Sequence, residues 1–134
     1  MPGMRAPGLV AAVLMVGALY GSAPAVAAPE EPGCATTVTT PQVIDVSGTA
    51  MVSASTSPGA CNRSEPQLQV VCLQRVGSQL APKCEEAGGP ATARVLLSPY
   101  VPGATYVATG RSCANQGSPA VPFCRAAGPV SATL

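Results

Sequence analysis

The distribution of proline and glycine limits this fold more than any other feature of the sequence. From residue 28 onward these residues recur at short intervals, in pairs such as Pro58-Gly59, Gly89-Pro90 and Pro102-Gly103. Proline lacks the N–H that a helix interior needs and glycine destabilises a helix interior, so no apolar stretch is long enough for a helix. The intervening segments are rich in Val and Thr with local apolar–polar alternation, which is typical of half-buried strands. The sequence therefore predicts an all-β fold.

Seven strands are expected, over residues 41–46, 48–56, 67–76, 79–84, 91–97, 104–113 and 124–133. Short strands at regular spacing over roughly 100 residues are typical of a single antiparallel sandwich. Residues 28–40 would form a lead-in, and residues 41–134 the sandwich domain itself.

Residues 1–27 have the layout of a removable export signal. Arg5 precedes an apolar run from Leu9 to Leu19, and small residues follow, ending in Ala25-Val26-Ala27. As a helix the run would span about 16 Å, roughly half of the hydrocarbon core of a membrane. We therefore expect cleavage after Ala27 and a secreted protein of 107 residues with no remaining membrane anchor.

The mature part has no net side-chain charge, because all six acidic residues and six of the seven basic residues lie after position 27. This balance disfavours nucleic acid or anionic lipid as a partner. The chain also lacks His, the commonest general base and metal ligand. Lys83, the only lysine, and the adjacent Glu85-Glu86 fit solvated surface positions better than a catalytic pair. The sequence therefore predicts a non-enzymatic protein with no metal and no other cofactor.

Large apolar residues are scarce, since Val, Leu, Ile and Phe make up only 20 of the 107 mature residues. Small exported domains with such thin cores are commonly stabilised by disulfides. We expect this of all six cysteines, which are Cys34, Cys61, Cys72, Cys84, Cys113 and Cys124. A zinc or redox site is disfavoured, because the chain contains no C-x-x-C pair and no His. Spacing alone leaves the pairing open.

The second half of the chain resembles a known family. The segment Tyr100-Val101-Pro102-Gly103-Ala104-Thr105-Tyr106 resembles the Leu-x-Pro-Gly-x-x-Tyr corner of fibronectin type III domains, with Tyr100 in place of the usual Leu. The end of the chain, residues 128–133, is similar to the final strand of that family, although the Trp of its second strand is missing. The resemblance implies an immunoglobulin-like sandwich in which Tyr106 packs inward and its hydroxyl bonds to backbone. The whole chain also resembles small secreted six-cysteine proteins of high-GC bacteria, which implies export but no particular activity.

The topology of an immunoglobulin-like sandwich selects among the cysteine pairings. It brings Cys34 to Cys61, because the chain enters its first strand at the end that carries the loop after residues 48–56. A hairpin around Gly77-Ser78 would place Cys72 opposite Lys83, so that a small bulge brings it to Cys84. Cys113 and Cys124 would face each other across residues 114–123. Cys113 follows Tyr106 by an odd number of residues and should therefore point away from the core.

The segments 57–66 and 114–123 are expected to be neighbouring loops at one end of the sandwich, where such folds commonly bind partners. Their candidate binding residues are Asn62, Arg63, Asn115, Gln116 and Phe123. The alternative is that the second loop is only a stable turn and Phe123 a satellite core residue.

These features favour a secreted interaction module that binds a protein or a cell-envelope component through its loops. Two alternatives stay open. A small-ligand carrier would need a cleft between one sheet and its loops, and a secreted protease inhibitor would need a rigid exposed loop. Nothing in the sequence specifies an oligomeric state.

Export should yield a protein that begins at Ala28 and contains no free thiol. Its intact mass is expected to equal that of residues 28–134 less six hydrogens, because three disulfides leave none of the six thiols free. The measurement is mass spectrometry of the exported protein before and after alkylation under denaturing, non-reducing conditions. Alkylation of any cysteine would contradict complete pairing.

Overall fold

The computed structural model describes residues 32–134, which form eight β-strands and no helix. In chain order the strands are β1 (Gly33–Val38), β2 (Gln42–Val46), β3 (Thr49–Asn62), β4 (Glu65–Arg75), β5 (Lys83–Gly88), β6 (Ala93–Leu97), β7 (Thr105–Gln116) and β8 (Val121–Thr133). The expected export signal lies outside the described residues. The prediction of an all-β fold is confirmed, with eight strands instead of seven.

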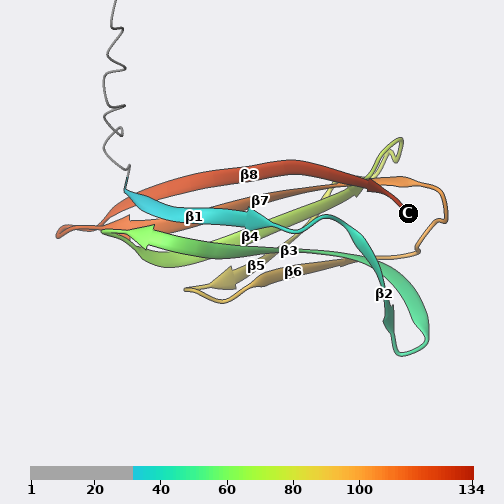
Figure 1. Cartoon of the computed structure of the whole chain (residues 1–134), viewed down its shortest axis with the longest axis horizontal. Helices are drawn as coiled ribbons and strands as arrows, with labels where there is room; N and C mark the ends of the chain where they lie inside the picture. Colours follow the sequence, from blue (N-terminus) through green and yellow to red (C-terminus); the bar gives the residue numbers. More distant parts are fainter. Residues whose placement is uncertain (1–31) are drawn as a thin grey trace, which may run out of the picture.

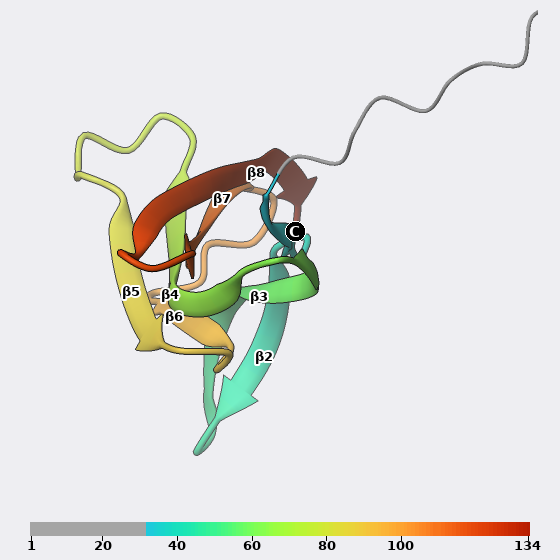
Figure 2. The same cartoon turned by 90° about the vertical axis from the view of Figure 1, so that its left-hand side faces the viewer.

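The strands form two antiparallel sheets that face each other as a sandwich (Figures 1 and 2). In the first sheet β3 pairs with β1, β2 and β6, and the second sheet has the order β5-β4-β7-β8. Thr56 of β3 pairs with both β1 and β6, and Val52 with both β2 and β6, so β1 and β2 follow one another along the same edge of β3. The extra strand is β1, which arises within the segment expected as a lead-in.

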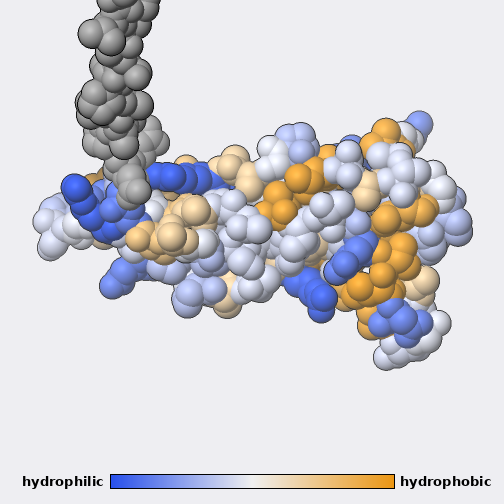
Figure 3. Space-filling model, in the orientation of Figure 1, coloured by the Kyte–Doolittle hydropathy of each residue, from blue (hydrophilic) through white to orange (hydrophobic). Residues whose placement is uncertain are grey.

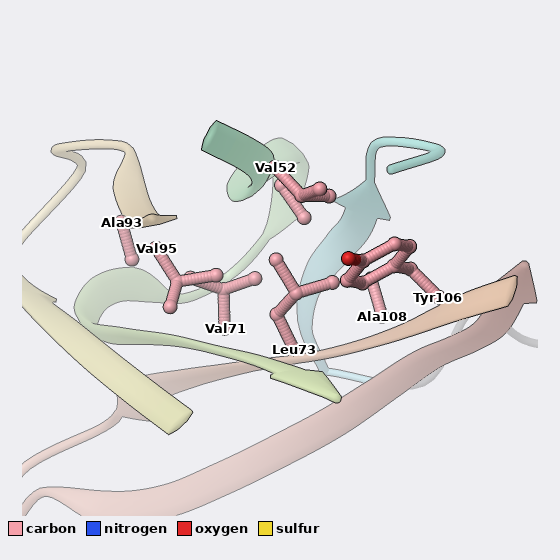
Figure 4. Packing of buried hydrophobic residues seen from close by; sticks show 8 residues of the cluster. Val52, Val71, Leu73, Ala93, Val95, Tyr106 and Ala108 are labelled. Carbon is pink, nitrogen blue, oxygen red and sulfur yellow. The ribbon is translucent and has the colours of Figure 1, made fainter. Parts of the chain in front are cut away.

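A small core fills the space between the sheets (Figure 4). It consists of eight buried residues, which are Val52, Ala54, Val71, Leu73, Ala93, Val95, Tyr106 and Ala108. The period-two alternation of a strand explains the selection, since alternate residues of β7 from Tyr106 to Ala114 are buried. Three of the eight core residues are alanines, so the sheets must approach closely to exclude water.

Tyr106 is the largest of the fully buried side chains. Its hydroxyl accepts a hydrogen bond from the backbone N–H of Val101, at 3.0 Å. This bond ties the connection between β6 and β7 to the core, as the resemblance of residues 100–106 implied. The inward packing and the backbone hydrogen bond of Tyr106 are confirmed.

The two sheets leave no room for a side chain at Gly110 of β7. A Cβ added there would overlap the hydroxyl of Thr56 on β3 and would lie 3.1 Å from Cβ of Val38 on β1. Thr56 is itself fully buried. Glycine is therefore required at position 110 by the close approach of the facing sheet rather than by its backbone conformation.

All six cysteines are paired, in the combination predicted: Cys34–Cys61, Cys72–Cys84 and Cys113–Cys124. Each disulfide joins residues that lie directly opposite each other on neighbouring strands, with Cα–Cα distances from 3.9 to 4.1 Å. None of the three connects one sheet to the other. Cys113 lies on the face of β7 opposite to Tyr106, as its odd spacing predicted.

The prediction of a strand over residues 79–84 is wrong. The chain runs as a loop over residues 76–82, and β5 begins only at Lys83. Pro82 has no N–H to contribute to a strand ladder at that point, which explains the late start. Cys72 pairs directly with Cys84, so the bulge that was expected to bring them together is not needed.

Gly110→Ala should lower the free energy of unfolding by about 1–3 kcal/mol, because the added methyl group overpacks the gap between the sheets. Gly88→Ala is the matched control, since an added Cβ at this strand glycine meets nothing within 4 Å. The control should stay within about 0.5 kcal/mol of the wild type. Chemical denaturation of both variants measures the difference, and equal midpoints would contradict the close approach at Gly110.

Tyr106→Phe should cost about 1 kcal/mol of stability, because the N–H of Val101 loses its acceptor. Tyr100→Phe is the control, since the half-buried Tyr100 makes no hydroxyl hydrogen bond within residues 32–134. Thermal and denaturant unfolding of the two variants compare them directly. A larger loss for Tyr100→Phe than for Tyr106→Phe would contradict the role assigned to the Tyr106 hydroxyl.

Candidate functional site

The segments 57–66 and 114–123 lie at the same end of the sandwich, at the left in Figure 1. Glu65 at the start of β4 pairs with Asn115 near the end of β7. The expectation that both segments are long loops is wrong, because β3 extends to Asn62 and β8 begins at Val121. Pairing with β1 prolongs β3, and the β7–β8 ladder continues beyond its disulfide. The true turns are residues 63–64 and 117–120.

A hollow of about 550 Å³ lies between these two turns. It is lined by Arg63, Ser64, Glu65, Gln67, Asn115, Gly117 and Ala120. Two of the predicted binding residues, Arg63 and Asn115, are therefore brought together in one place. On the face shown in Figure 3 the most apolar residues gather toward the other end of the molecule, over β2.

A β-bulge explains how Gln67 comes to line the hollow. In the β4–β7 ladder Pro66 pairs with Ala114 and Leu68 with Cys113, so Gln67 is an extra residue without a partner in the register. Bulges re-aim side chains and are common at the ends of sheets. Sequence reasoning missed Gln67, although Pro66, which cannot donate to the ladder, is a signal that could have located the irregularity.

Arg63 connects the two sheets in a strained backbone conformation. Its φ is 49°, in the left-handed region that side chains other than glycine rarely adopt. Such a conformation costs on the order of 1–3 kcal/mol and is found more often at binding sites than elsewhere. The side chain of Arg63 is exposed at the rim of the hollow.

The polar side chains of the hollow leave most of their hydrogen-bonding capacity unused. Within residues 32–134 the side chains of Arg63, Glu65 and Asn115 make no hydrogen bond or ion pair. Ser64 donates from its hydroxyl to the carbonyl of Asn62 at 2.9 Å, and the amide of Gln67 makes one long contact with the carbonyl of Glu65 at 3.5 Å. A guanidinium, a carboxylate and an amide therefore line one space without forming hydrogen bonds or ion pairs with each other.

The other three predicted residues do not line the hollow. Asn62 ends β3 opposite Gly33, and Gln116 pairs with Val121 in the hairpin ladder. Phe123 lies opposite the buried Ala114 and is itself half-buried. This position favours the alternative in which Phe123 is a satellite core residue rather than a contact for a partner.

A series of hydrogen bonds around a buried polar side chain supports the hollow from inside the sandwich. Gln69, two residues beyond the bulge, is fully buried and donates through its amide to the carbonyl of Gly89 at 3.1 Å. The hydroxyl of Ser112 on β7 donates to the side-chain oxygen of Gln69. The N–H of Gly89 donates to the carbonyl of Gln67 at 2.8 Å. These bonds link β4 to β7 and to the residues after β5, which holds the bulge in place.

Two further hollows lie elsewhere on the molecule. One of about 120 Å³ opens at the opposite end of the sandwich, beside Leu73, Leu97 and Tyr106. The other, of about 330 Å³, lies on the outer face of the second sheet over the Cys72–Cys84 disulfide. The hollow beside Tyr106 is smaller than the 300–1,000 Å³ of typical small-molecule sites. The hollow over the disulfide is a shallow surface area above two neighbouring strands.

Residues 32–134 contain no group of three or more His, Cys, Asp or Glu side chains that could hold a metal ion. The same residues include no helix of the length and apolarity needed to cross a membrane.

Comparison of the chain with protein-family models, with curated proteins and with solved structures finds no significant match.

Proposed function

We propose that this chain is an exported, non-enzymatic binding module that holds a protein or a cell-envelope component against the hollow between residues 63–67 and 115–120. The observation that carries the proposal is the set of unsatisfied side chains of Arg63, Glu65 and Asn115 around one space. A partner that pairs with them recovers hydrogen bonds that the protein alone does not form.

The rigidity of the surrounding strands supports this assignment. Arg63 follows the Cys34–Cys61 pair by two residues, and Asn115 follows Cys113 by two residues. Each turn is thus held by a covalent bond close to its base. The backbone of the binding residues therefore loses little conformational freedom on association, which favours affinity.

The charges of the hollow indicate what kind of chemistry the partner presents. Arg63 and Glu65 carry opposite charges, so together they attract neither a polyanion nor a polycation. The amides of Asn115 and Gln67 can each donate and accept. This set fits a neutral or zwitterionic surface with alternating donors and acceptors, such as an exposed peptide backbone or an uncharged envelope polymer, and not a nucleic acid.

We further propose that the domain is a fibronectin type III-like variant of the immunoglobulin-like sandwich. The two-sheet arrangement and the Tyr106 corner support it. Three disulfides in a small domain are typical of extracellular proteins, which supports export guided by residues 1–27.

Fewer observations support the two other functions, a small-ligand carrier and a protease inhibitor. A small-ligand carrier would use the hollow of about 120 Å³ beside Tyr106, which holds little more than one small apolar group. A protease inhibitor would present the short turn 117–120 behind the Cys113–Cys124 bond.

Arg63→Ala and Asn115→Ala should each weaken binding by about tenfold, since each removes a hydrogen bond worth roughly 1–2 kcal/mol. The mature protein and both variants are immobilised and exposed to culture filtrate and to cell-wall fractions. Recovered material is quantified by mass spectrometry.

Glu86→Ala is the control, because Glu86 is an exposed residue of β5 away from the hollow, and recovery with it should match the wild type. Equal recovery with wild type and with the Arg63→Ala, Asn115→Ala double variant would contradict the proposal. A small bound mass in native mass spectra, unchanged in that double variant, would favour the carrier. Stoichiometric inhibition of a protease panel would favour the inhibitor.

A further inference from the structure

The outer face of the sheet β5-β4-β7-β8 carries two of the three disulfides, Cys72–Cys84 and Cys113–Cys124. They are not in equivalent surroundings. The guanidinium of Arg111 donates from Nη2 to the sulfur of Cys124, at 3.3 Å. Arg111 is exposed, and within residues 32–134 this sulfur is its only hydrogen-bonding or ionic partner. The positive charge beside Cys124 is therefore not neutralised by a carboxylate.

Cys124 is also the more exposed residue of its pair. It is exposed and lies on β8, the last strand of the sheet, whereas Cys113 is half-buried on β7 between β4 and β8. Leu68 of β4 stands directly opposite Cys113 on its other side. Cys124 is reached from the solvent-exposed outer face of the sheet, because the edge of β8 next to it is approached by β1.

From this geometry we propose that Cys124 is a thiol–disulfide exchange site for a small external thiolate. The thiolate sulfur attacks Cys124 Sγ and forms a new S–S bond, while the Cys113–Cys124 bond breaks. The electron pair of that bond leaves with Cys113, which becomes the new thiolate. One negative charge is present before and after the step, and no oxidant or reductant is consumed. Arg111, two residues before Cys113 on the same face, attracts the incoming anion and stabilises the departing one.

The other two disulfides lack this combination. Cys34 is buried, with 2% of its surface exposed, so the Cys34–Cys61 bond is shielded on one side. The Cys72–Cys84 bond is exposed at Cys84, but within residues 32–134 no cationic side chain donates a hydrogen bond to either of its sulfurs. Lys83, next to Cys84 in the chain, instead donates from Nζ to the carbonyl of Leu96 on β6, at 2.9 Å. Its charge is therefore directed to the inner side of the sheet.

Exchange at Cys124 would also change the mobility of residues that line the hollow. This consequence rests on the proposed function. Asn115, Gly117 and Ala120 all lie within the ring that the Cys113–Cys124 bond closes. When the ring opens, β8 is joined to the end of β7 only by the three residue pairs beyond the disulfide, Ala114–Phe123, Asn115–Pro122 and Gln116–Val121, while β7 itself stays paired with β4 at Ala114 and Asn115. The turn that carries Gly117 and Ala120 in the wall of the hollow should then become more mobile.

The test incubates the oxidised mature protein, without any partner, with a small excess of reduced glutathione. Samples are quenched with acid, alkylated and mapped by peptide mass spectrometry. We expect the first adduct on Cys124 with a free, alkylated Cys113, formed at least about fivefold faster than any adduct on Cys72 or Cys84. A first adduct on Cys113, or equal rates at the two exposed disulfides, would overturn the proposal.

Arg111→Gln should slow adduct formation about fivefold at low ionic strength, with a smaller difference at high salt because the charge is screened. Arg111→Lys, which keeps the charge, should restore most of the rate, and Lys83→Gln should leave it unchanged. Thermal unfolding under oxidising conditions checks that each variant is folded. An Arg111→Gln rate equal to that of wild type would overturn the role of Arg111. Since no binding partner takes part, failure here is distinguishable from failure of the binding proposal.

Discussion

The register of three strand pairs in this domain is fixed by covalent bonds, and the rest of the structure depends on that register. Each disulfide joins two directly opposite residues, so it holds one ladder against slippage. A slip of one residue would turn every side chain of a strand to the other face, which in a core of eight mostly small residues would leave little to bury. Packing of such a core distinguishes only weakly between registers, so the disulfides fix the register instead. A disulfide typically contributes about 2–4 kcal/mol through restriction of the unfolded chain, on top of this fixing of register.

The features that could be predicted from the sequence are those set by strand topology and by the alternation of side chains along a strand. The cysteine pairing and the orientation of Cys113 followed from topology and from the period of two along a strand, and both are confirmed. The start of β5 was missed because Lys83 to Gly88 contains no β-branched or aromatic residue, and an edge strand can form through backbone pairing alone. β1 was missed for a related reason, because its place in the sheet depends on how far β3 extends.

The candidate site was predictable only in part. Arg63 and Asn115 could be named because topology brings the two ends of the sandwich together, and the structure places both at one hollow. Glu65 and Gln67 were not singled out, since their position depends on the bulge between Pro66 and Leu68, a local break in register. The sequence left the role of Phe123 open, because the direction of its side chain depends on the ladder between β7 and β8, which continues past the disulfide. In each case the missing information was the exact register or length of a strand pair rather than its existence.

The disulfides also divide into two roles according to the face on which they lie. Cys34 is buried at the start of β1, where Arg125 of β8 donates to the carbonyl of Pro32 at 3.0 Å and Thr36 donates to the carbonyl of Arg125 at 3.2 Å. Opening that bond would loosen the contact between the two sheets. The Cys113–Cys124 bond lies outside the core, and the β7–β8 ladder extends well to either side of it. Exchange at this bond can therefore take place in the folded protein, because the side chains that hold the sheets together do not need to move.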